Sequence, residues 1–230
     1  MREVALVAAI AMFAASALAA DPWYPSKYGK DDTIGAANNL SPEIVVEAAK
    51  LVKTGKTYSL GVTTGPDTPA YGTRNFQIFT ESSIIGTPLG TNKATGNDDF
   101  LATWMGIGSQ LDGLGHLGID YTYYNGHKES EFLRPHGLLL LSTDKVPPIV
   151  TRGVLLDFVA LQGANLTPGK AINRAEIEAA VAKQGTPIRK GDVVLLHTGW
   201  LASMAAKDKK AFLEKEPGLG KGGAEYLASL

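Results

Sequence analysis

The spacing of apolar and polar residues predicts two amphipathic helices whose ends are well marked. The first spans residues 41–55, where a Ser-Pro-Glu start supplies a capping hydroxyl, a proline at the first helical position and an acid in the first turn, and a glycine ends the helix. The second spans residues 173–185, where an asparagine and a glutamate three residues later form a capping pair, and a glycine follows the last turn. Further helical patterns cover residues 201–216 and 224–228.

Four segments have the pattern of β-strands: Thr57–Val62, Asn75–Thr80, Gly153–Val159 and Asp192–His197. The last two contain unbroken apolar runs, which are typical of strands buried on both faces of a sheet. No repeat and no clear linker divides the chain. We therefore expect one α+β domain over residues 20–230.

The N-terminal segment predicts export. Arg2 precedes an apolar run over residues 4–19, which ends in the small-residue triplet Ala-Leu-Ala. A basic start, an apolar core and a small-residue site are together typical of a secretory signal peptide. The run is shorter than the ~20 residues that a membrane-spanning helix needs. We expect a signal peptide over residues 1–19, cleavage after Ala19, and a periplasmic or secreted protein that has no membrane association after cleavage.

The amino-acid composition excludes several classes of function. The 230 residues include 22 Lys+Arg and 23 Asp+Glu, for a formal net charge of −1, so the chain lacks the electrostatic field that binds nucleic acid. There is no cysteine, which excludes disulfide bonds, thiolate metal sites, iron–sulfur clusters and a cysteine nucleophile. Any bound metal must therefore be held by oxygen atoms and imidazole nitrogens.

The densest polar cluster lies in residues 106–116, with the sequence Gly-Ile-Gly-Ser-Gln-Leu-Asp-Gly-Leu-Gly-His. Alternate side chains of an extended segment point the same way, so Gln110 and Asp112 are expected to converge. The glycines at 113, 115 and 118 would let the chain turn and bring His116 to the same point. An amide, a carboxylate and an imidazole suit Zn or Mn. This strand and turn predict a metal site with Gln110, Asp112 and His116 as ligands.

The same residues also allow structural interpretations. Asp112 and the glycine after it form a common turn dipeptide. His197 ends a predicted buried strand, where a hydrogen-bonded structural histidine is the simpler interpretation. The tyrosines of residues 121–124 either line a pocket or pack against a sheet. The candidate substrate-binding residues are Trp104, Tyr124 and His197.

The segment that ends at His116 resembles the signature of a known family, the cyclase or kynurenine formamidase-like metal-dependent hydrolases. That signature is His-x-Gly-Thr-His-x-Asp-x-Pro-x-His. Aligned on His116, it matches Gly108 and Asp112 and sets Ser109 on its threonine, whereas its first two histidines and its proline fall on Gly106, Gln110 and Leu114. Further segments resemble the family in the same order: residues 28–40, 53–60, 152–157, 191–195, 197–200 and 217–219.

The resemblance implies a flattened, barrel-like mixed β-sheet with outer helices, assembled as a homodimer. It also implies hydrolysis of an amide or cyclic amide by metal-activated water, with Asp112 and His116 as the catalytic residues and His116 carrying the proton to the leaving nitrogen. The family takes a further His and a Glu for its metals from beyond the Pro-Gly-Leu of residues 217–219. Because the last helical segment has no C-terminal cap, we expect that a C-terminal portion is missing.

The substrate stays open at this point. An N-formyl aromatic amine such as formylkynurenine, the arylformamidase substrate of tryptophan catabolism, is the family default, and an isatin-like cyclic amide or a lactone are the alternatives. Export argues against routine tryptophan catabolism, which is expected in the cytoplasm. The rival interpretation is an exported protein that binds a small molecule without catalysis, because Gly106 and Gln110 stand where the family has imidazoles.

Overall fold

The fold was obtained as a computed structural model, which describes residues 23–82, 88–204 and 208–230. The predicted signal peptide lies outside the described residues. In the part of the chain that is described, no helix is both long and apolar enough to cross a membrane.

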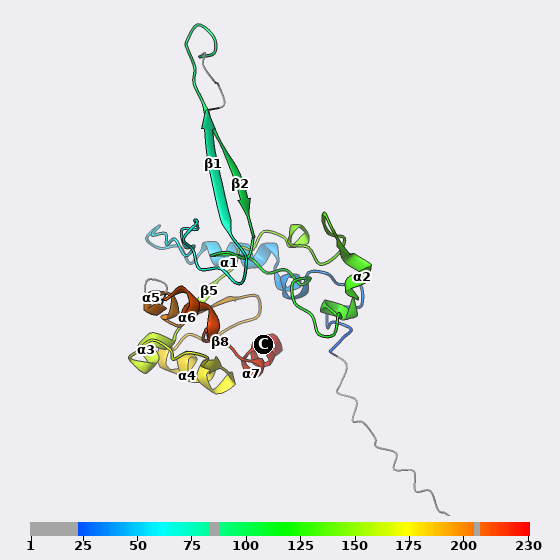
Figure 1. The fold of residues 1–230 in the computed structure, drawn as a ribbon. Coiled ribbons are helices and arrows are strands. Elements are labelled where there is room, and N and C mark those ends of the chain that lie inside the picture. The colour runs from blue at the N-terminus through cyan, green and yellow to red at the C-terminus, as the bar shows by residue number, and fades with distance from the viewer. Residues whose placement is uncertain (1–22, 83–87, 205–207) are drawn as a thin grey trace, which may run out of the picture.

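Short helices and short strands alternate along the chain (Figure 1). The α-helices are α1 (Pro42–Ala49), α2 (Glu129–Phe132), α3 (Phe158–Gln162), α4 (Arg174–Gln184), α5 (Trp200–Met204), α6 (Lys209–Glu214) and α7 (Lys221–Ser229). The strands are β1 (Phe76–Ser82), β2 (Asn97–Thr103), β3 (Leu133–Arg134), β4 (Gly137–Leu138), β5 (Gly153–Asp157), β6 (Ala171–Ile172), β7 (Val193–His197) and β8 (Gly218–Leu219). Three 3₁₀ turns complete the list: η1 (Gly35–Asn39), η2 (Tyr124–Gly126) and η3 (Thr143–Lys145).

The described strands form four two-stranded sheets and no closed barrel. The pairs β1–β2 and β3–β4 are antiparallel, and the pairs β5–β7 and β6–β8 are parallel. The expected barrel-like sheet is therefore not present in the described ranges. One reason is that the predicted strand at residues 57–62 makes no strand pairing and runs as irregular chain.

The main hydrophobic core lies between the β5–β7 pair and helices α3 and α4. Its buried members are Val154, Leu156, Phe158, Leu166, Ile172, Ile177 and Ala180. Along β5 the buried residues Val154 and Leu156 alternate with Leu155, which is 50% exposed. The expectation that this strand is buried on both faces was thus wrong, because helices cover only one face of the pair.

The predicted helix ends are confirmed in part. Ser41 caps α1 by accepting a hydrogen bond from the Ile44 amide at 3.4 Å, but the helix ends at Ala49, earlier than expected. Helix α4 starts with the expected capping box of Asn173 and Glu176 and ends at a left-handed glycine. The single helix expected over residues 201–216 is two helices, α5 and α6.

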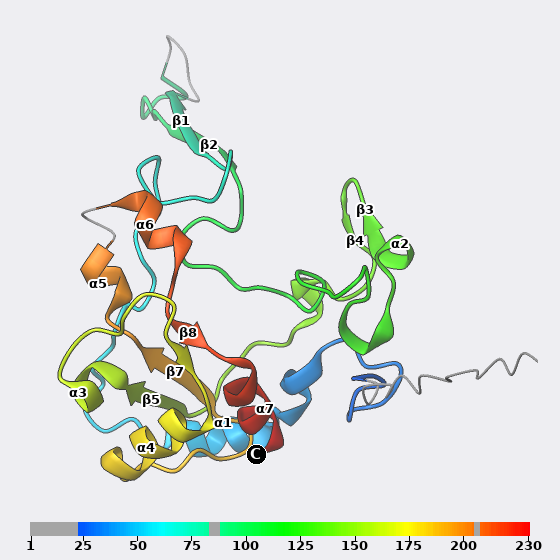
Figure 2. The ribbon, with the colours of Figure 1, turned by 60° about the horizontal axis from the view of Figure 1, so that its bottom comes forward.

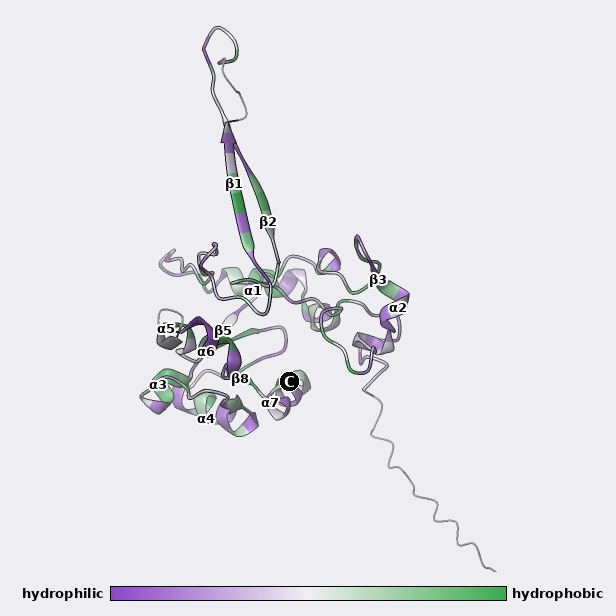
Figure 3. Ribbon diagram, in the orientation of Figure 1, coloured by the Kyte–Doolittle hydropathy of each residue, from purple (hydrophilic) through white to green (hydrophobic). Residues whose placement is uncertain are grey.

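The β1–β2 hairpin projects away from the rest of the described chain (Figure 1). Its two strands pair with each other from Phe76–Thr103 to Ser82–Asn97. The ribbon of the hairpin is coloured hydrophobic along its middle (Figure 3). Four apolar residues of its strands are exposed: Ile78 (49%), Phe79 (52%), Phe100 (64%) and Leu101 (52%). The predicted strand at Asn75–Thr80 is confirmed as β1, although the core does not cover it.

The chain that leaves β2 connects the hairpin to a second small lobe containing α2, β3 and β4 (Figure 2). Phe132 and Leu141 are 1% exposed and form the interior of that lobe. The connecting chain, residues 104–118, includes the polar cluster found in the sequence, so the cluster lies between the projecting hairpin and this lobe.

Candidate functional site

Residues 104–118 form turns and bends instead of the predicted strand. The segment is held by contacts with distant parts of the chain. The Val62 amide donates a hydrogen bond to the Ser109 hydroxyl at 2.9 Å, and buried Ile107 is 4% exposed. The site loop is therefore anchored at the residues that come immediately before Gln110.

Gly108 is the position where this loop needs glycine. Its φ is +74°, and an added Cβ would lie 2.3 Å from the Thr64 hydroxyl oxygen. An L side chain is strained at such a φ, and no Cβ fits at such a distance. The Gly108 match to the family signature thus has a physical cause, which is the close approach of the residue 61–64 segment.

The structure brings the three predicted metal ligands together. The Gln110 amide Nε2 lies 3.0 Å from Asp112 Oδ1 and donates a hydrogen bond to it. The His116 Nε2 lies 3.8 Å from the same carboxylate oxygen. The three side chains are exposed to solvent. Gln110 and Asp112 therefore share one side of the loop, as predicted, although the chain between them is not a strand.

His116 is positioned by a tight turn and by packing beneath it. Its backbone amide donates to the Gly113 carbonyl at 3.0 Å. An added Cβ at Gly115 would lie 2.8 Å from Leu138 and 3.3 Å from both Leu141 and Phe132. Neither glycine has a positive φ. The expected tight turn before His116 is thus present, and the lack of a side chain at Gly115 also allows close packing against the α2–β4 lobe.

Arg74 borders the same cluster and was not predicted. Its Nη1 donates to the Gly106 carbonyl at 3.4 Å. An added Cβ at Gly106 would lie 2.8 Å from that Nη1 and 3.3 Å from Gln110 Oε1. A guanidinium therefore fills the space beside Gln110 that a side chain at residue 106 would enter. No motif marks Arg74, because it lies 32 positions before Gly106 in the sequence.

Tyr124, a predicted substrate-binding residue, lies in a hydrogen-bond network with the N-terminal segment. Its hydroxyl donates to Asp32 Oδ2 at 2.6 Å and lies 2.6 Å from the Ser26 hydroxyl. Burial and the Asp32 hydrogen bond raise the pKa of Tyr124 to about 12. The pKa of Asp32 is lowered: burial opposes the shift, but hydrogen bonds from Tyr124, Asn38 and nearby backbone amides outweigh it.

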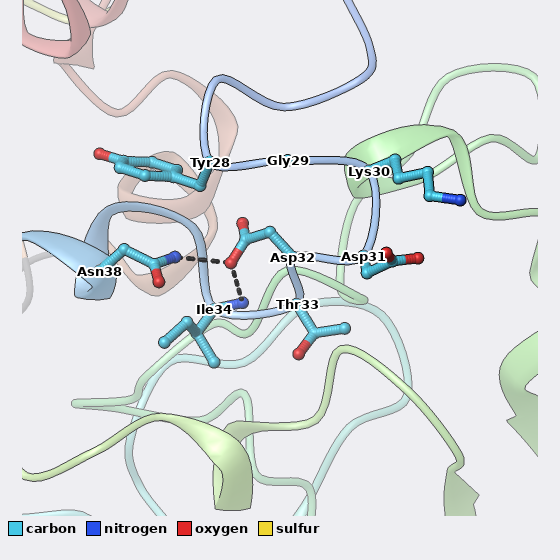
Figure 4. Close-up of a pocket in the computed structure, with 8 residues that line it drawn as sticks. All are labelled: Tyr28, Gly29, Lys30, Asp31, Asp32, Thr33, Ile34 and Asn38. Carbon is cyan, nitrogen blue, oxygen red and sulfur yellow. Dashed lines mark hydrogen bonds between the residues drawn. The ribbon is translucent and has the colours of Figure 1, made fainter.

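An open hollow lies beside this network and is formed by one loop (Figure 4). Its lining residues are Tyr28, Gly29, Lys30, Asp31, Asp32, Thr33, Ile34 and Asn38. Asp32 Oδ1 accepts hydrogen bonds from the Asn38 amide at 2.5 Å and from the Ile34 backbone at 3.3 Å. Because this carboxylate already accepts several hydrogen bonds, Asp32 serves to hold the loop, and the hollow lies apart from Gln110, Asp112 and His116.

His197 and Trp104 lie outside the contacts that join the three predicted ligands. His197 Nδ1 lies 2.9 Å from Asp157 Oδ1, and the two residues are register partners at the carboxyl ends of β7 and β5. The carboxylate also caps α3 through the Ala160 amide at 2.9 Å. The Ala160 amide and His197 lower the pKa of Asp157. Trp104, which follows β2, is 55% exposed.

The side chains of Gln110, Asp112 and His116 offer a divalent metal ion one charged and two neutral groups. In the described residues no three His, Cys, Asp or Glu side chains gather at one point. Gln110 lies beside Asp112, but its amide nitrogen Nε2 faces the Asp112 oxygen at 3.0 Å and its Oε1 faces Gly106, so the amide would have to rotate to offer its oxygen to a metal. Carboxylate, amide oxygen and imidazole are the ligand types that suit Zn or Mn. Their exposure leaves room for water and substrate, as in an open catalytic site.

Comparisons with known proteins identify the family. The sequence model of the Cyclase family matches residues 58–230. A crystal structure described as that of a novel cyclase superposes with a TM-score of 0.79 and 30% sequence identity, over 88% of this chain and 71% of that one. No curated protein gives a match. The matched region covers most of the chain and includes Gln110, Asp112 and His116, and the chain belongs to the cyclase family.

Proposed function

We propose that this protein is a metal-dependent hydrolase that cleaves an amide or cyclic amide. The observation that carries the proposal is the convergence of Gln110 and His116 on one oxygen of Asp112, at 3.0 and 3.8 Å. The acid and the imidazole are the two positions of the family signature at which this chain keeps a metal-ligating side chain. Family membership supports an enzyme, and the reaction is inferred from this cluster.

In this proposal Gln110 and Asp112 would hold a Zn or Mn ion, and His116 would either bind it as a third ligand or lie beside it. Such an ion supplies Lewis-acid activation of water and of the amide carbonyl. When His116 lies beside the ion and does not bind it, its imidazole is the group that would accept a proton from the attacking water and deliver it to the leaving nitrogen. The water oxygen bonds to the carbonyl carbon, the C–N bond breaks, and the products are a carboxylic acid and an amine. Asp112 orients His116 and supplies negative charge to the ion.

The substrate class follows from this chemistry. An N-formyl aromatic amine is the first candidate, as in arylformamidases, and an isatin-like cyclic amide or a lactone meets the same requirement for an activated carbonyl. Exposed Trp104 lies two residues before Gly106 and offers an aromatic surface near the loop. We propose Trp104 as a contact for the ring of the substrate, whereas Tyr124 and His197 are already hydrogen-bonded to Asp32 and Asp157.

The test combines metal content with turnover. The protein and its Asp112→Asn variant are loaded with Zn or Mn, dialysed and analysed for metal, and are then assayed with formanilide, isatin and an aryl lactone. We expect metal close to one ion per chain and turnover of one substrate class. Both should be lost in Asp112→Asn, because an amide removes the only formal charge among the three ligands.

Asp98→Asn is the matched control, because it makes the same chemical change on the projecting β2 strand. It should keep both metal and activity. Full metal content and full turnover in Asp112→Asn would refute the assignment of the site. Tight binding of a substrate without turnover in the metal-loaded protein would instead favour the non-catalytic binding protein.

We also propose that the protein forms a homodimer through the β1–β2 hairpin. The pairs Phe79–Phe100 and Ile78–Leu101 lie at adjacent register positions, so they present apolar surface on opposite faces of the hairpin. Such exposed apolar surface is typical of an interface, and symmetric homo-oligomers are the commonest assemblies. Light scattering should give twice the chain mass. Phe100→Ser should shift the protein toward monomer, whereas Leu139→Ser, at an exposed position off the hairpin, should not.

A further inference from the structure

The Arg74 guanidinium lies at the position where the family signature would place a histidine side chain. The family signature has a histidine at residue 106, and this chain has glycine there. The Arg74 head lies over that glycine, with Nη1 2.8 Å from where a Cβ would be and 3.4 Å from the carbonyl oxygen. The loss of one imidazole therefore coincides with the entry of a permanent cation from another segment of the chain.

Arg74 is half-buried and has no ion-pair partner among the described residues. Its nearest ring is Tyr71, with the guanidinium carbon 5.9 Å from the ring centroid. Burial raises the pKa of Tyr71, and the charge and hydrogen bond of Glu216 raise it further. The nearby Glu216 carboxylate is thus engaged by the Tyr71 hydroxyl. A guanidinium has five N–H donors, and one weak bond to the Gly106 carbonyl leaves most of them available.

One side chain links the Arg74 head to the acid and the imidazole. Gln110 Oε1 lies 3.3 Å from the Cβ position over which the guanidinium sits, and Gln110 Nε2 contacts Asp112. The Gln110 carboxamide therefore has Asp112 at one end and the space beside Gly106 and Arg74 at the other. A substrate group bound by Arg74 would lie near the proposed reacting centre.

We propose that Arg74 binds a carboxylate of the substrate, so that the substrate class is an amide with a carboxylate close to the scissile C–N bond. The inference rests on the proposed hydrolase function for the identity of that bond. The planar guanidinium fork matches a carboxylate with two parallel hydrogen bonds, which a lysine cannot reproduce. Arg74 is a substrate-binding residue in this assignment, and the proton transfer remains with His116.

The test uses two formamides that differ only in the carboxylate: N-formylanthranilate, with the acid ortho to the formamide, and formanilide, which lacks it. The metal-loaded protein should prefer N-formylanthranilate. Arg74→Gln should raise the KM for N-formylanthranilate by about 10- to 100-fold, the effect of losing charged hydrogen bonds. It should raise the KM for formanilide far less, because formanilide has no carboxylate for Arg74 to bind. The KM of Arg74→Lys for N-formylanthranilate should lie between those of the wild-type protein and Arg74→Gln.

Arg134→Gln is the matched control, because Arg134 also donates to backbone carbonyl groups but lies in β3. It should leave the KM for both substrates unchanged. An equal loss of activity on both substrates in Arg74→Gln would overturn the proposal, because it would assign Arg74 a role in holding the loop. Equal wild-type rates on the two substrates, with no effect of Arg74→Gln, would overturn it as well.

A second measurement separates this inference from the proposed function. If the wild-type protein hydrolyses neither formamide, the hydrolase proposal fails, and binding of anthranilate is then followed by its own fluorescence. Binding that is lost in Arg74→Gln and kept in Arg134→Gln would support a carboxylate site at Arg74. Absence of binding, or equal binding by all three proteins, would overturn it.

Discussion

Replacing Gly108 with alanine is expected to destabilise the loop that carries Gln110 and Asp112. Two effects contribute. A non-glycine residue at φ +74° costs about 1–2 kcal/mol of backbone strain. The added Cβ would also lie 2.3 Å from the Thr64 hydroxyl and 3.2 Å from its methyl group, and overpacking of this kind costs about 1–3 kcal/mol. Together they predict a loss of about 2–5 kcal/mol in the free energy of unfolding.

Urea unfolding followed by circular dichroism measures this loss. Gly55→Ala is the matched control, because Gly55 has φ +67° and nothing within 4 Å of an added Cβ. It should show the strain alone. In the double variant Gly108→Ala/Thr64→Ala, the hydroxyl and methyl groups are gone and the nearest remaining Thr64 atom lies at 3.3 Å, so most of the steric part should be recovered.

The reasoning would be refuted if Gly108→Ala cost no more than Gly55→Ala, or if removing the Thr64 hydroxyl and methyl recovered nothing. The first result would mean that the loop shifts away from the residue 61–64 segment without penalty. The second would mean that the loss is not steric. Either outcome would also weaken the positioning of Gln110 that the proposed metal site requires, since the Ser109–Val62 hydrogen bond belongs to the same contact.

Three further outcomes are expected. Leu156→Ala, at a fully buried core position, should lower the free energy of unfolding by about 2–5 kcal/mol, whereas Leu155→Ala on the exposed face of the same strand should cost far less. The pKa of Tyr124 is raised to about 12, so the neutral tyrosine contributes its full stabilisation below pH ~10, the ordinary tyrosine pKa, and this contribution is lost as the pH rises toward 12. In thermal melts over a pH series, Tyr124→Phe should remove that part of the loss of stability at alkaline pH. If the protein is exported, N-terminal sequencing of the periplasmic or secreted form should begin at residue 20, and a start at Met1 would contradict the predicted signal peptide.

Local patterns predicted the helix that starts at Asn173 because its capping box and terminal glycine act through contacts between residues close in sequence. They also located β5 and β7, because the apolar residues of these strands must be buried in whatever core forms around them. They failed for residues 57–62, which have the composition of a strand but find no partner strand. They also failed for the single helix at 201–216, which the structure divides into α5 and α6.

Some features of the candidate site likewise follow from the sequence, and others only from the tertiary structure. The sequence by itself determined that Gln110, Asp112 and His116 could meet, because all three lie within seven residues and the glycines between them allow a tight turn. It also determined the family resemblance and excluded every thiolate chemistry. Tertiary structure alone decided that Arg74 enters the place of the missing imidazole and that Tyr124 is held by Asp32. These contacts join residues that are 32 and 92 positions apart, and no local pattern encodes which distant side chain will fill a given space.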